Sequence, residues 1–160
     1  MFAVTGFFGG IAAVYYVVLS VRLMMLRASL DIPMGNGAVE YAIEICGNGG
    51  KATSPLPSNR FSPLHKLAWA QTKFVEFSLF YFLLMGTIES FNGSVFSEGL
   101  MVVISIVFLL GCLLYTEAGT IPEKPIQCGG VSVGTIGGVL IYLPIFLLGV
   151  FTFINAIDHW

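Results

Sequence analysis

The sequence predicts an all-α integral membrane protein in which four transmembrane helices form a bundle. Of its 160 residues, 56% are hydrophobic and only 10% are charged, whereas charged residues make up about a quarter of a typical soluble domain. Three long stretches contain no charged side chain, namely residues 1–21, 99–116 and 125–157. Because a helix of about 20 residues crosses the hydrocarbon core, residues 1–160 have room for one domain of about four spans.

The first predicted span covers residues 2–27. Its positive charges, Arg22 and Arg27, follow the apolar run instead of preceding it, which favours a retained helix over a cleaved signal peptide. Residues 28–63 are rich in Gly, Pro, Asn and Ser, which break long helices, so this segment is predicted to be an extramembrane loop.

Three further spans are predicted at residues 64–89, 99–117 and 130–157. Turn-forming residues separate these spans, and Pro144 lies within the last one, where membrane bundles tolerate a kink. Four spans place the loops alternately on the two sides of the membrane. The basic residues in the loops and at the ends of the spans then gather on the side of the long loop, which the positive-inside rule makes the inner side, with both termini outside. These residues are Arg27, Lys51, Arg60, Lys66 and Lys124.

Charge and cysteine content exclude several classes of function. A net charge of −2 without a basic cluster argues against a nucleic-acid partner. Three widely spaced cysteines, Cys46, Cys112 and Cys128, fit neither a disulfide framework nor a metal site, so no metal is expected. The lipid bilayer is the one certain partner of such a chain, and the sequence does not decide between an organellar membrane and the endoplasmic reticulum.

Glycine spacing predicts which helices pack most closely. Gly6 and Gly10 in the first span, and Gly130, Gly134 and Gly138 in the fourth, each recur at four-residue intervals. Such small residues let helix backbones approach. We therefore expect the first and fourth helices to make close contacts.

Lys73 and Glu76 are the two charged residues in the middle of a predicted span. Their i, i+3 spacing allows them to pair on one helix face. A charge facing hydrocarbon is costly, so the pair is expected to face the bundle interior. The pair is either a polar ligand site between helices or a mutually neutralising structural pair. Trp69 and Phe80 share its helix face at helical spacing.

Three short motifs then suggest a family. Arg27 is followed by Gly35-Asn36-Gly37, the second span contains Lys73-Phe74-Val75-Glu76-Phe77, and the third contains Gly111-Cys112-Leu113-Leu114-Tyr115. In order and spacing these motifs resemble those of the MAPEG family, the membrane-associated proteins in eicosanoid and glutathione metabolism. The resemblance implies a four-helix fold, assembly as a homotrimer and a glutathione site between subunits.

The implied site is degenerate. The positions that correspond to the family's glutathione-binding residues are Trp69, Gln71, Lys73 and Glu76, and of these only Glu76 keeps the family's residue type. The helix-three arginine of the family would fall on Cys112, which as an uncharged thiol cannot stabilise a thiolate. Tyr115 could donate a hydrogen bond in its place, so Tyr115 and Cys112 are the candidate catalytic residues.

The resulting prediction is a divergent MAPEG-like protein that has lost glutathione chemistry, binds no cofactor and is not an enzyme. It would serve as a structural or interaction subunit, either among other membrane protein subunits or as a homotrimer. The alternative is a glutathione-dependent transferase or peroxidase that acts on lipophilic substrates. A third possibility, a small channel or transporter, lacks a polar pathway, because one charge pair does not line a pore.

Overall fold

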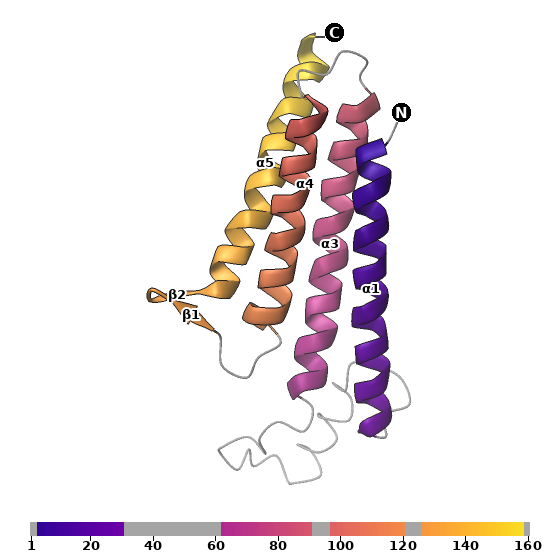
Figure 1. Cartoon of the computed structure of the whole chain (residues 1–160), viewed down its shortest axis with the longest axis vertical. Coiled ribbons are helices and arrows are strands. Elements are labelled where there is room, and N and C mark those ends of the chain that lie inside the picture. Colours follow the sequence, from indigo (N-terminus) through magenta and orange to yellow (C-terminus); the bar gives the residue numbers. More distant parts are fainter. Residues whose placement is uncertain (1–2, 31–61, 91–96, 121–125, 159–160) are drawn as a thin grey trace, which may run out of the picture.

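The computed structural model describes residues 3–30, 62–90, 97–120 and 126–158, which form four long helices and a short hairpin. Successive helices run in opposite directions, so the start of α1 and the end of α5 lie at one end of the bundle, and the hairpin lies toward the other end, level with the middle of α1 (Figure 1). The predicted all-α bundle is confirmed. The elements are α1 (Ala3–Ser29), α3 (Ser62–Ser90), α4 (Glu98–Leu113), the π-helical segment η1 (Leu114–Thr120), β1 (Gln127–Cys128), β2 (Val131–Ser132) and α5 (Val133–Asp158).

Three of the helices are long and apolar enough to cross a membrane, at Ala3–Ser29, Glu98–Ala118 and Val133–Ile154. The protein is therefore a helical membrane protein. Helix α3 has a similar length but a more polar composition, and it lies alongside the other helices over the same height (Figure 1). Its crossing of the bilayer remains a prediction. The predicted loop 28–63 lies almost entirely outside the described residues.

Side chains from diagonally opposite helices fill the centre of the bundle. Helix α3 packs beside α1 and α5, and α4 packs beside the other faces of the same two helices. Across the centre, the ring of Tyr81 stacks on that of Phe108, with 3.9 Å between ring centroids. The buried hydroxyl of Tyr81 also forms a 2.8 Å hydrogen bond with the hydroxyl of Ser105. Because no water reaches this depth, the pairing satisfies both polar groups.

The prediction that the first and fourth helices pack closely through glycine is wrong. Helices α1 and α5 lie at opposite corners of the bundle, and a Cβ atom at Gly6 or Gly10 would meet nothing within 4 Å. Gly130 does not belong to α5, because it lies in the hairpin turn with a φ of 83°. Glycine at four-residue spacing on these two helices therefore does not mark their contact.

The close glycine contact instead joins α4 to α5. A Cβ atom on Gly137 would lie 2.6 Å from the backbone nitrogen of Tyr115 and 2.9 Å from the carbonyl oxygen of Gly111. A Cβ atom on Gly111 would in turn lie 2.9 Å from the Cβ atom of Leu140. These two glycines let the backbones of α4, η1 and α5 touch.

The hairpin shortens the fourth predicted span at its start. Gly129 and Gly130 both have positive φ, as the two central residues of a type I′ turn require. The strands pair Gln127 with Ser132 and Cys128 with Val131. Helix α5 therefore begins at Val133, and it continues through Pro144.

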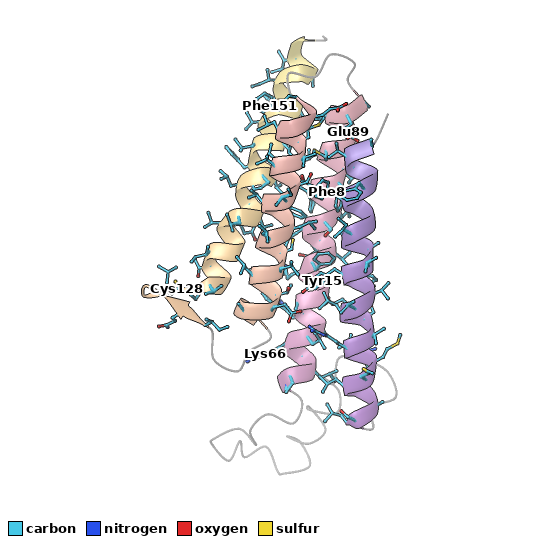
Figure 2. The ribbon with its side chains drawn as sticks, in the orientation of Figure 1. Phe8, Tyr15, Lys66, Glu89, Cys128 and Phe151 are labelled. Carbon is cyan, nitrogen blue, oxygen red and sulfur yellow. The ribbon has the colours of Figure 1, made fainter. Side chains whose placement is uncertain are left out.

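A carboxylate from α3 caps the first turn of α1. The backbone N–H of Val4 donates to Glu89 Oε1 at 2.9 Å, and that of Thr5 donates to both carboxylate oxygens at 3.3 Å. The first N–H groups of a helix have no partner within the helix, and a negative charge there also interacts well with the helix dipole. Glu89 therefore joins α1 to α3 at the end opposite the hairpin, where Figure 2 places it.

Replacing Glu89 with alanine is expected to lower the free energy of unfolding by about 1 kcal/mol, the usual loss when a helix cap is removed. Glu89→Gln is the matched control, since the amide oxygen still accepts a hydrogen bond, and it should lose clearly less. Unfolding of the purified protein in detergent, followed by circular dichroism, measures both. Equal stability of Glu89→Ala and the parent would contradict the cap.

Candidate functional site

A row of side chains on the outer face of α3 carries the predicted ion pair. We call this row the α3 outer stripe; its members are Trp69, Lys73, Glu76 and Phe80. Lys73 Nζ lies 2.6 Å from Glu76 Oε2 and 5.9 Å from the centroid of the Trp69 ring. The predicted pairing is confirmed. Its predicted direction is wrong for the single chain, because the two side chains are 31% and 47% exposed on the bundle surface.

This ion pair lies level with the middle of the candidate span in α1. The ring centroids of Phe77 and Tyr142 are 5.4 Å apart, and Tyr142 lies near the midpoint of the apolar span in α5. The ring centroids of Phe74 and Tyr15 are 5.1 Å apart, and Tyr15 lies near the midpoint of the span in α1. The Lys73–Glu76 pair lies on the same segment of α3 as Phe74 and Phe77.

An open groove of about 720 Å³ lies next to the stripe, between the N-terminal halves of α3 and α5 and the segment η1. Trp69 and Tyr115 line it together, with their ring centroids 6.1 Å apart. The rings of Phe77 and Tyr115 pack edge to face, with 5.8 Å between their centroids. The groove is also lined by His65, Lys66, Thr135 and Tyr142.

The structure gathers only some of the residues predicted from the sequence. Trp69, Lys73, Glu76 and Tyr115 lie on the same side of the bundle, around the groove and the stripe. Gln71 points elsewhere, since its Nε2 donates a 2.7 Å hydrogen bond to the hydroxyl of Ser20 on α1.

Cys112 lies in the core and is 1% exposed. A substrate could reach its thiol only if the bundle repacked. The thiol therefore behaves as a small apolar group in the core. Of the other motif residues, Arg27 lies in the last turn of α1, and Gly35, Asn36 and Gly37 lie outside the described residues.

Sequence reasoning missed a polar network between α1 and η1. Arg22 Nη1 donates to Glu117 Oε1 at 2.5 Å, and the hydroxyl of Tyr15 donates to the same oxygen at 3.1 Å. The Tyr15 hydroxyl also lies 2.6 Å from Oγ1 of the buried Thr116. Alternating topology could have revealed the Arg22–Glu117 pair, because the end of the first span and the end of the third lie on the same side.

The π-helical turn explains how two successive residues join this network. A π-helix has more residues per turn than an α-helix, so it rotates the side chains that follow it. Thr116 Oγ1 also donates to the carbonyl of Cys112 at 2.8 Å, which satisfies part of the widened turn. The network therefore joins η1, which continues α4, to α1 through Thr116 and Glu117. Tyr115 of the same segment lines the groove.

Across the described ranges, no group of three or more His, Cys, Asp or Glu side chains is arranged to hold a metal ion. Comparisons of the chain with protein-family models, with curated proteins and with solved structures give no match.

Proposed function

We propose that the protein is a structural or interaction subunit of a larger membrane assembly, in which another protein chain covers the α3 outer stripe. The observation that carries this proposal is the Lys73–Glu76 pair, which is exposed on the surface of a bundle whose other long helices are candidate membrane spans. A charge that faces hydrocarbon is costly, and pairing recovers only part of this cost.

The composition of α3 supports the same conclusion. The other three long helices are apolar enough to face lipid, whereas α3 is not among the apolar candidate spans. A helix that carries an exposed ion pair on its outer face and lies alongside apolar candidate spans is best accommodated beside another protein. Polar groups of the partner would then form the hydrogen bonds to Lys73 and Glu76 that water cannot form inside a bilayer.

Within this proposal the chain is a divergent MAPEG-like protein without glutathione chemistry. The support is the replacement of the family's cationic site residues by Trp69 and Cys112, together with the burial of Cys112 and the diversion of Gln71 to α1. Helix α4 then has no charged side chain at the position of the family's arginine, which stabilises the thiolate of glutathione. The partner is either a different membrane protein or further copies of this chain.

The mass of the protein extracted in mild detergent tests the proposal. Native mass spectrometry should show an assembly heavier than the single chain of 17.3 kDa. Its subunit composition would distinguish a homotrimer from a complex with other proteins. A folded single chain, obtained from its own membranes without any associated protein, would contradict the proposal.

A further inference from the structure

The groove beside α3 changes in chemical character along its length. Its outer end is formed by His65 and Lys66 in the first turns of α3, by Ser132 in β2 and by Thr135 in the first turn of α5. Its inner end is formed by apolar and aromatic side chains, among them Trp69 and Tyr142. The groove is therefore polar and cationic at one end and apolar at the other.

The polar end lies at the start of the candidate span in α5 and the apolar end near the midpoint of that span. Lys66 lies toward the hairpin end of the bundle in Figure 2, whereas Tyr142 is near the midpoint of the span in α5. From Val133 to Tyr142, a helix rises about 14 Å at 1.5 Å per residue. This distance is about half of the ~30 Å hydrocarbon core, so the groove spans one leaflet.

We propose that this groove binds an anionic phospholipid from the leaflet at the hairpin end. The phosphate would lie against His65 and Lys66 and accept hydrogen bonds from the hydroxyls of Ser132 and Thr135, which are 2.7 Å apart. One acyl chain would lie along Trp69 and Tyr142. The positive-inside topology gives this end the leaflet that carries most anionic lipid.

The dimensions of the groove favour a lipid over a partner helix or a free anion. A volume of about 720 Å³ is in the range of sites for small ligands, and it is too small for a transmembrane helix. A soluble anion would use only the outer end and leave the apolar half empty. Gly138 keeps the groove open, since a Cβ atom there would meet only the ring of Tyr115, at 3.9 Å.

This inference goes beyond the proposed function, because it concerns the groove beside the α3 outer stripe, and Trp69 is the one residue that belongs to both. Trp69 provides the reporter. The chain has two tryptophans, and Trp160→Phe leaves Trp69 as the only one. The protein is reconstituted into phosphatidylcholine vesicles that contain brominated phosphatidic acid or, at the same mole fraction, brominated phosphatidylcholine, whose bromine atoms quench tryptophan on contact.

Brominated phosphatidic acid is expected to quench Trp69 more strongly than brominated phosphatidylcholine. Lys66→Gln should lower this preference about five-fold, the effect of about one basic residue on binding to an anionic surface. Lys66→Arg should keep it, and so should Lys51→Gln, which removes a charge from the same predicted side. Gly138→Leu should fill the groove and abolish the preference; Val139→Phe is the second blocking variant if Gly138→Leu does not fold.

Three outcomes would overturn the proposal. Equal quenching by the two lipids would mean ordinary lipid at the protein surface. Absence of quenching by either lipid would mean that protein fills the groove. Relief of phosphatidic acid quenching by millimolar inorganic phosphate would identify a site for a soluble anion.

Discussion

Replacing Gly137 with alanine is expected to destabilise the protein by about 1–3 kcal/mol, the usual cost of inserting a methyl group into a contact that has no room for it. The new Cβ atom would lie 2.6 Å from the backbone nitrogen of Tyr115. Backbone atoms cannot turn aside as a flexible side chain can, so α5 would have to move away from α4 and η1. This loss exceeds the benefit of about 1 kcal/mol that alanine normally gives over glycine inside a helix.

Unfolding in a denaturing detergent, followed by circular dichroism, measures the effect. Gly149→Ala is the matched control on the same helix, because a Cβ atom there would meet nothing within 4 Å. The control should be as stable as the parent or slightly more stable. If Gly137→Ala and Gly149→Ala unfold alike, the close contact between α4 and α5 is wrong.

Glu76→Ala is expected to be more damaging than the double change Lys73→Met with Glu76→Ala. The single change leaves a lysine on the outer face of α3 without its 2.6 Å partner, and an unpaired charge that faces hydrocarbon is costly. The double change removes both charges, so the remaining surface is apolar and compatible with lipid. The non-additivity of the two substitutions measures the coupling within the pair.

The same unfolding assay compares the two variants, and native mass spectrometry reports their assembly. The charge-reversed pair, Lys73→Glu with Glu76→Lys, is the control that separates folding from partner binding. It keeps an ion pair on α3 and should fold as a single chain, yet it should lose a partner whose polar groups match the original order of charges. Equal stability of Glu76→Ala and the double variant would show that the pair contributes nothing.

The positions of the four helices could be predicted from the sequence, because runs without charge and the turn residues between them can be read directly along the chain. Bilayer thickness sets the length of a span, and glycine, proline and charged residues end it. The predicted boundaries of residues 2–27 and 64–89 differ from α1 and α3 by one or two residues. The start of α5 was predicted three residues too early, because Gly129 and Gly130 belong to a hairpin turn without charge.

Helix contacts could not be predicted from spacing alone. Gly6 and Gly10 recur at the same interval as other packing glycines, but nothing in one sequence says which helix face meets which neighbour. The contact of Gly111 with Gly137 depends on the order of the helices around the bundle. The predicted direction of the Lys73–Glu76 side chains was wrong for a related reason. The prediction assumed that a single chain surrounds the pair on all sides, whereas the pair is exposed on the surface of the single chain.

The candidate site was predicted in part for the same reasons. The i, i+3 spacing of Lys73 and Glu76 is a local property of a helix, and the pair forms as expected. Gln71 lies only two residues away, yet on a helix this rotates its side chain toward α1, where it meets Ser20. The groove combines α3 with the start of α5, and its outline depends on the hairpin that the sequence did not reveal.

Photocrosslinking from position 80 tests most directly whether protein covers the α3 outer stripe. Phe80 lies one turn beyond Glu76 and is 60% exposed on the single chain, so a photoreactive residue there samples whatever lies against the stripe in the membrane. Our account predicts a protein adduct of defined mass, either with a second copy or with one other subunit, which disappears when the Lys73–Glu76 charges are reversed. Adducts with lipid alone would contradict it.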